Sequence, residues 1–141
     1  MVDTQKQIQQ QRPQTLAEVV TLGAACEELD GYLREFLDAY YLEPECSQRV
    51  TMLSVEPPLL EDPRKNAYLA AVAEHLSLRE RLSVPSWALA AHRFLKRPYF
   101  PCGLESLKAI LLVESPTAFR RRLIFVGADP LFRPRKNSAG V

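Results

Sequence analysis

Cysteine and histidine are scarce in this chain of 141 residues, which contains three cysteines and two histidines. Cys26, Cys46 and Cys102 form an odd set without C-x-x-C spacing, whereas a disulfide framework needs an even and denser set. We therefore expect reduced thiols, as in a cytoplasmic protein. Neither His75 nor His92 has a cysteine or another histidine at the spacing of metal ligands, so the sequence predicts no metal site.

Glycine and long apolar runs are also scarce. The five glycines are scattered along the chain, so no glycine-rich loop is available to bind phosphate groups. No apolar stretch approaches the roughly 18–20 residues that a membrane span requires, and the first residues lack the apolar core of a secretory signal. We expect a cytoplasmic protein that uses no cofactor and binds no membrane.

The composition is that of an ordinary globular domain. Hydrophobic residues make up 47% of the chain and charged residues 25%, values that exclude fully disordered and fibrous proteins. A chain of this length is expected to form one domain and to bury roughly two-thirds of its unfolded surface. It therefore needs no disulfide or metal in order to fold.

The formal net charge of +1 hides a strong separation of charge along the chain. Residues 16–62 contain eleven acidic residues and two arginines, whereas residues 63–141 contain fourteen basic residues and five acidic ones. The net charge is thus −9 in the acidic part and +9 in the basic part. Two interpretations stay open: the two parts neutralise each other within the fold, or they face different partners.

Helical patterns begin after a polar N-terminal segment. Residues 1–14 contain six glutamines and almost no apolar residue, which predicts a flexible tail. Thr15 and Glu18 then have the spacing of a capping box, with Thr15 as the N-cap. The apolar spacing that follows predicts helix over residues 16–41, either as two helices or as one helix bent near Gly31.

Helix start signals recur further along the chain. Asp62 followed by Pro63 combines a capping acid with a proline at the first helical position, and predicts a helix over residues 63–82. Ser86 and Ser115 are each expected to act as the N-cap of a shorter helix.

The remaining segments complete an all-α fold. Apolar spacing over residues 104–111 indicates one more helix, residues 50–53 fit a short strand or a helical turn, and residues 123–126 fit a helix end or a β-like segment. The predicted fold is a compact bundle of about five or six helices joined by irregular proline-rich loops, with little or no sheet. One helical domain would cover residues 15–132, followed by a basic, flexible C-terminus at residues 133–141.

Arg120, Arg121 and Arg122 are the most concentrated group of positive charge. Consecutive residues of a helix project in different directions, and three of them span roughly 200°, so these arginines cannot all lie in one core. They fit ion pairs with the acidic part of the same chain, contact with a partner protein, or binding of a nucleic-acid backbone. The nucleic-acid signal is weak, because the group lacks interleaved aromatic residues.

A second group combines aromatic and basic side chains between positions 87 and 100. Trp87, Arg93 and Phe100 belong to the residue types that dominate interface hot spots. The same residues also fit an ordinary core, because a lone tryptophan beside phenylalanine and tyrosine is more often buried. The sequence leaves both interpretations open.

No nucleophile signature accompanies the candidates for catalysis. Cys102 would need a base such as His75 or His92 within reach, and the residues around them match no known arrangement. We therefore expect no enzyme activity; a small hydrolase or transferase built on these three side chains is the least favoured alternative.

Six strings in the sequence carry a family resemblance. They are residues 66–76 (NAYLAAVAEHL), 85–87 (PSW), 93–95 (RFL), 98–100 (PYF), 114–122 (ESPTAFRRR) and 124–126 (IFV). Over roughly residues 30–132 the chain resembles a little-characterised bacterial domain. That domain is found as the C-terminal part of helix-turn-helix regulators and as stand-alone proteins accompanying nucleotidyltransferase-type toxins.

The resemblance implies a regulatory or antitoxin-like protein that binds a partner protein, with a nucleotidyltransferase-type toxin as the candidate partner. A DNA-binding helix-turn-helix is not expected, because residues 16–41 are acidic where a recognition helix would be basic. The expected mechanism is occlusion of an acidic active-site rim by a basic, partly aromatic surface. The residues expected on that surface are Trp87, Arg93, Phe100, Arg120, Arg121 and Arg122. The alternative is a transcriptional regulator that binds nucleic acid through the basic C-terminal half.

Overall fold

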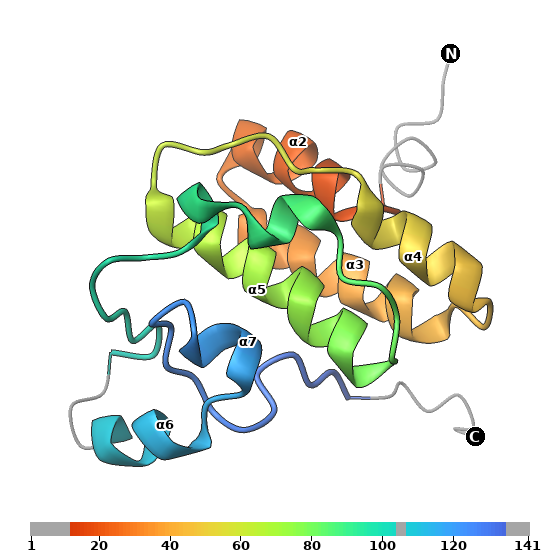
Figure 1. The fold of residues 1–141 in the computed structure, drawn as a ribbon. Coiled ribbons are helices and arrows are strands. Elements are labelled where there is room, and N and C mark those ends of the chain that lie inside the picture. The colour runs from red at the N-terminus through yellow and green to blue at the C-terminus, as the bar shows by residue number, and fades with distance from the viewer. Residues whose placement is uncertain (1–11, 104–106, 135–141) are drawn as a thin grey trace.

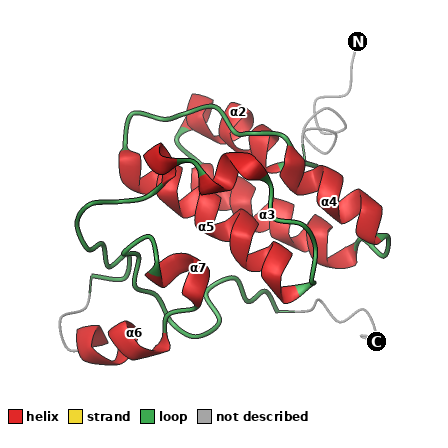
Figure 2. Ribbon diagram, in the orientation of Figure 1, coloured by secondary structure: helices red, strands yellow, loops and turns green. Residues whose placement is uncertain are grey.

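The computed structural model describes residues 12–103 and 107–134. Its helices are α2 (Leu16–Cys26), α3 (Leu29–Leu42), α4 (Cys46–Ser54), α5 (Pro63–Arg79), α6 (Lys108–Glu114) and α7 (Thr117–Arg120), with the 3₁₀ turns η1 (Ser86–Leu89) and η2 (Ala91–Arg93) between α5 and α6. The described residues contain no strand, so the prediction of an all-α fold is confirmed (Figure 1, Figure 2). Their β structure is limited to an isolated parallel bridge between Tyr99 and Ile124.

Helix α5 runs through the centre of the fold, with α2, α3 and α4 on one side and α6 and α7 on the other (Figure 1). The Asp62 carboxylate accepts a hydrogen bond from the Arg64 backbone N–H at 2.9 Å, and Pro63 is the first helical residue, as the sequence predicts. The helix ends at Arg79 rather than at residue 82. The chain turns there because Arg81 adopts a left-handed conformation with φ 58°.

The predicted cap of the first helix is present. The Thr15 hydroxyl accepts a hydrogen bond from the Glu18 backbone N–H at 3.1 Å. The Glu18 carboxylate accepts from the Gln14 N–H at 2.6 Å rather than from the N–H of Thr15. The reciprocal half of the capping box is therefore shifted by one residue.

The predicted helical region over residues 16–41 is two helices, and the corner between them lies at Glu27 rather than near Gly31. Glu27 adopts a left-handed conformation with φ 56° and ends α2. Gly23 permits the sharp corner, because a Cβ atom there would lie 2.8 Å from the Leu29 Cα. Gly31 instead lies inside the first turn of α3.

Other local predictions are corrected by the structure. Residues 50–53 belong to α4 and not to a strand. Neither Ser86 nor Ser115 is the N-cap of a helix, since the N-cap position of both η1 and α7 is a proline, and Ser115 is instead the C-cap of α6. The buried Ser115 hydroxyl instead donates to the Leu111 carbonyl at 2.6 Å and accepts from the Val126 N–H at 2.9 Å. It thereby ties the end of α6 to the chain that follows α7.

The predicted flexible ends fall mostly outside the described part of the chain. Residues 1–11 and 135–141 are not described, and the same is true of residues 104–106, within the helix predicted over residues 104–111. Arg133 is described and is held in place, because its guanidinium binds the Asp38 carboxylate of α3 at 2.9 Å. None of the described helices has the length and apolar character needed to cross a membrane.

Ion pairs connect the acidic and basic parts of the chain. Arg93–Glu56 at 3.1 Å and Arg133–Asp38 at 2.9 Å each join a base of the basic part to an acid of the acidic part, whereas Arg49–Glu80 at 2.7 Å joins the two parts with the opposite polarity. The two parts therefore neutralise each other in places, as the first of the two interpretations predicts.

Candidate functional site

Arg93 was expected on the partner-binding surface, and the structure corrects this prediction because its side chain is fully buried. One guanidinium nitrogen donates to the Asn66 carbonyl at 3.2 Å, and the other donates to the Pro57 carbonyl at 2.7 Å. The second nitrogen also binds the Glu56 carboxylate at 3.1 Å. A buried arginine is tolerated when its donors find such partners, so Arg93 anchors the loop before α5 to the core.

Trp87 is also buried, which again corrects the predicted surface. Only 8% of the residue is exposed, and its indole N–H donates to the Leu53 carbonyl at 2.9 Å. The Arg93 guanidinium lies 4.9 Å from the centre of the Trp87 ring. Trp87 and Arg93 therefore belong to the core, which was one of the two interpretations of the sequence. Their hydrogen bonds connect η1 to α4 and η2 to α5.

Arg122 is the third predicted surface residue that the structure buries. Its guanidinium forms an ion pair with the buried Glu74 carboxylate of α5, and also donates to the Ala118 carbonyl at 2.8 Å and to the Ala88 carbonyl. Burial lowers the pKa of the Arg122 guanidinium, and the hydrogen bond that it donates to the Glu74 carboxylate opposes that shift. Arg121 shares the same carboxylate at 3.1 Å but leaves 46% of its side chain exposed.

Phe100 and Arg120 remain available, and both lie beside α6. Phe100 is half-buried; its ring stacks on Phe125 with centroids 5.1 Å apart, and the Lys108 ammonium lies 4.9 Å from its centre. Arg120 is exposed and reaches the Val113 carbonyl in the last turn of α6 at 3.5 Å. Two of the six predicted residues thus contact α6, whereas the half-exposed Arg121 lies over the Phe94 ring at 5.3 Å.

Helix α6 itself was not among the predicted site residues. Leu111 is its only buried residue, whereas Ile110 is 51% exposed, Val113 75% and the preceding Leu107 37%. Residues three apart share one side of a helix, so Leu107, Ile110 and Val113 form a continuous apolar face. The helix lies at the periphery of the fold, away from the bundle around α5 (Figure 1). The signal in the sequence was a short helix that is apolar nearly all round, a pattern typical of buried helices.

We call Phe100, Leu107, Ile110, Val113 and Arg120 the α6 surface. Two basic residues precede Phe100 in the chain: Lys96 and Arg97 are exposed and form no ion pair with any described residue. Glu114 is the acidic residue of the helix. The surface therefore combines an apolar face with charged residues of both signs, Arg120 and Glu114, at the C-terminal end of the helix.

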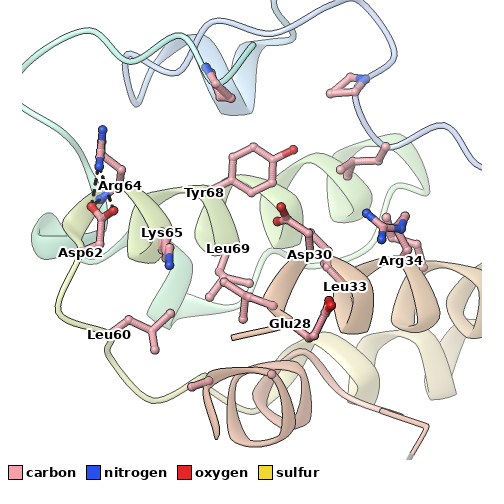
Figure 3. A pocket seen from close by; sticks show the side chains of 18 of the residues that line it. Glu28, Asp30, Leu33, Arg34, Leu60, Asp62, Arg64, Lys65, Tyr68 and Leu69 are labelled. Atoms are coloured by element: carbon pink, nitrogen blue, oxygen red, sulfur yellow. Dashed lines mark hydrogen bonds and ion pairs between the residues drawn. The ribbon is translucent and has the colours of Figure 1, made fainter. Parts of the chain in front are cut away.

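A groove of about 1080 Å³ is the second candidate, between the corner of α2 and α3, the start of α5 and residues 130–133 (Figure 3). Tyr68 and Asp30 approach one another inside it (Figure 3). Burial raises the pKa of Tyr68 to about 12, and the neighbouring Asp30 carboxylate adds to the shift. Arg64 is already engaged, because it pairs with Asp62 at 3.1 Å and lies over the Tyr99 ring at 5.1 Å.

The groove does not assemble a reaction centre from its described residues. Its rim carries both signs of charge: Glu27, Glu28, Asp30, Glu61, Asp62, Arg34, Arg64, Lys65 and Arg133. No described group of histidine, cysteine and carboxylate side chains is arranged to hold a metal ion. None of the three catalytic candidates lines the groove: His75 packs on Phe119, His92 faces Glu56 at 3.8 Å, and Cys102 is exposed.

The chain was compared with protein families, curated proteins and solved structures. No protein family, no curated protein and no solved structure was found to match the chain.

Proposed function

We propose that this protein is a non-enzymatic interaction protein that binds a partner protein through the α6 surface. The observation that carries the proposal is that α6 leaves an apolar face in contact with water. Covering Ile110 and Val113 with a partner would contribute on the order of 1 kcal/mol each, since both side chains are already partly buried. An apolar patch with a polar border is typical of protein-binding surfaces.

The resemblance suggests a nucleotidyltransferase-type toxin as the partner and an antitoxin-like role for this chain. Enzymes of that class bind metal ions through carboxylates, so their active-site rim is acidic. The exposed Arg120 guanidinium of the α6 surface would pair with a carboxylate of such a rim, and the apolar face beside it would block access to the active site. The interface is smaller than the sequence predicts, because Trp87, Arg93 and Arg122 lie in the core.

The test is co-expression of the full chain with a nucleotidyltransferase-type protein encoded by a neighbouring gene. We expect Ile110→Glu to weaken the affinity of the complex at least about tenfold, because a carboxylate would be buried against the partner. Leu78→Glu is the matched control, since Leu78 lies in α5 and is also 51% exposed. Circular dichroism would show that both variants keep the helical fold.

Two results would contradict the proposal. The first is a wild-type chain that does not bind the neighbouring protein. The second is an Ile110→Glu variant that binds as tightly as the wild type, or a Leu78→Glu variant that loses binding equally.

The second candidate is a nucleic-acid-binding regulator, and the observation that favours it is a set of three exposed cations in the basic part of the chain. Lys96, Arg97 and Arg120 form no ion pair with a described residue. This function requires a mobility shift of DNA or RNA at low salt that weakens steeply as salt is added. It gives no role to the apolar face of α6, and for that reason we place it second.

A further inference from the structure

The C-terminal end of α6 carries one cation and one carboxylate beside the apolar face. Arg120 and Glu114 are both exposed, and neither forms an ion pair with any described residue. The Arg120 guanidinium reaches the Val113 carbonyl at 3.5 Å, and Glu114 follows Val113 in the chain. Both charges therefore lie close to Val113, which is the most exposed large apolar residue of the helix at 75%.

We infer that the α6 surface binds the same surface of a second copy of this chain, so that two copies form a symmetric dimer. A two-fold axis brings the same patch of both copies together, so a patch that pairs with itself must be complementary to itself. An axis that lies in the interface between Arg120 and Glu114 brings Arg120 of each copy to Glu114 of the other. The apolar residues beside these two charges then cover one another, because Val113 and Ile110 belong to the same face.

Other occupants match this pair of charges less well. An apolar strip bordered only by carboxylates would pair with Arg120 but would bring a like charge to Glu114, and a nucleic-acid backbone would do the same. A nucleic acid would also leave Ile110 and Val113 uncovered. The dimer needs no charge at the start of the helix, where the Lys108 ammonium already lies 4.9 Å from the centre of the Phe100 ring.

The position and size of the surface set the kind of dimer. Helix α6 lies at the periphery of the fold, where a second copy can approach it without meeting the bundle around α5 (Figure 1). A helix of seven residues offers far less than the roughly 800 Å² that each partner of a standard interface buries. We therefore expect a weak dimer in rapid exchange with the monomer. It would cover the face that the proposed function uses, so self-association and binding of a partner protein would exclude one another.

The first experiment is sedimentation velocity of the full chain between about 10 µM and about 1 mM, where the weight-average mass should rise from that of a monomer towards that of a dimer. Val113→Glu places a carboxylate of each copy in the apolar contact and should raise the dissociation constant at least about tenfold. Leu78→Glu is the control and should leave the dissociation constant unchanged, since Leu78 lies in α5 and is 51% exposed. Circular dichroism would show that both variants keep the helical fold.

The second experiment exchanges the charges. Arg120→Glu gives each copy two carboxylates at the contact, and Glu114→Arg gives each copy two cations, so either variant alone should associate at least about tenfold more weakly than the wild type. An equimolar mixture of the two variants should regain the wild-type association, because every pair then joins a carboxylate to a cation. Arg81→Glu is the control for a change of net charge, because Arg81 is an exposed arginine that follows α5.

Three outcomes would overturn the inference. One is a chain that stays monomeric up to about 1 mM. Another is self-association that Val113→Glu and Leu78→Glu weaken equally, and a third is a mixture of the two charge variants that associates no better than either alone. The inference does not rest on the proposed function: if the chain is monomeric while the neighbouring nucleotidyltransferase-type protein still binds through Ile110, the dimer is wrong and the proposed function stands.

Discussion

At the scale of single residues, the buried Glu74 carboxylate pairs with two adjacent arginines that differ in their burial. Arg122 is fully buried and pairs with Glu74, whereas Arg121 pairs with the same carboxylate from a side chain that is 46% exposed. A buried charge is tolerated because it is paired, and removal of its partner is costly. Glu74 is therefore a structural residue, although the sequence offered no sign of that role.

We predict that Glu74→Gln lowers the free energy of unfolding by about 3 kcal/mol, because the buried Arg122 loses its counter-charge. Arg121→Gln should cost less than about 1 kcal/mol, since water compensates for an exposed ion pair. Urea unfolding followed by circular dichroism measures both. Equal losses of unfolding free energy in the two variants would show that the buried Arg122–Glu74 pair stabilises the fold no more than the exposed Arg121–Glu74 pair does.

At the scale of elements, the corner between α2 and α3 depends on close approach of two backbones. Gly23 lies so near Leu29 that a Cβ atom would be 2.8 Å from its Cα, within backbone that has no flexible side chain to move aside. Gly31 has only side-chain atoms near it, at 3.5 Å or more. The two glycines therefore have different roles: Gly23 permits the corner at the end of α2, whereas Gly31 in the first turn of α3 permits no close approach.

We predict that Gly23→Ala destabilises the protein by about 2 kcal/mol, because the steric overlap outweighs the better helix propensity of alanine. Gly31→Ala should be neutral or stabilising by up to about 1 kcal/mol. The midpoints of chemical unfolding compare the two variants directly. A stabilised Gly23→Ala variant would mean that the corner can open without cost.

At the scale of the whole molecule, the acidic and basic parts of the chain are joined by partly buried ion pairs. Arg49 of α4 binds Glu80 at 2.7 Å, and its guanidinium also lies 5.1 Å from the centre of the Tyr40 ring. Burial raises the pKa of Tyr40 to about 12, which keeps the phenol neutral beside this pair. This pair joins the two parts without offsetting their net charges, because Arg49 belongs to the acidic part and Glu80 to the basic part.

We predict a coupling energy of about 1 kcal/mol between Arg49 and Glu80 in a double-mutant cycle of Arg49→Gln and Glu80→Gln. The cycle uses free energies of unfolding at low salt. High salt should reduce the coupling only slightly, because both side chains are partly shielded from water. A coupling near zero would mean that the Arg49–Glu80 pair does not help to hold the two parts together.

The sequence predicted those features of the fold that depend only on neighbouring residues, such as the starts of helices. Thr15 and the pair Asp62–Pro63 start helices because capping and proline geometry depend on a few neighbouring residues. Ser115 is not the N-cap that the sequence predicts, because its hydroxyl forms hydrogen bonds with the backbone of Val126, eleven residues away. The site was predicted in part: Phe100 and Arg120 are on the α6 surface, whereas the apolar face of α6 went unnoticed.

The sequence by itself determined the all-α class, the main helix starts and the separation of charge, because these follow from residue types and their spacing. Only the tertiary structure decided which arginines are buried, since Arg122 and Arg120 have the same side chain and nearly the same place in the chain. What separates them is the position of Glu74, which lies 48 residues from Arg122 in sequence. Long-range contacts of this kind also decide that α6 presents its apolar face to solvent.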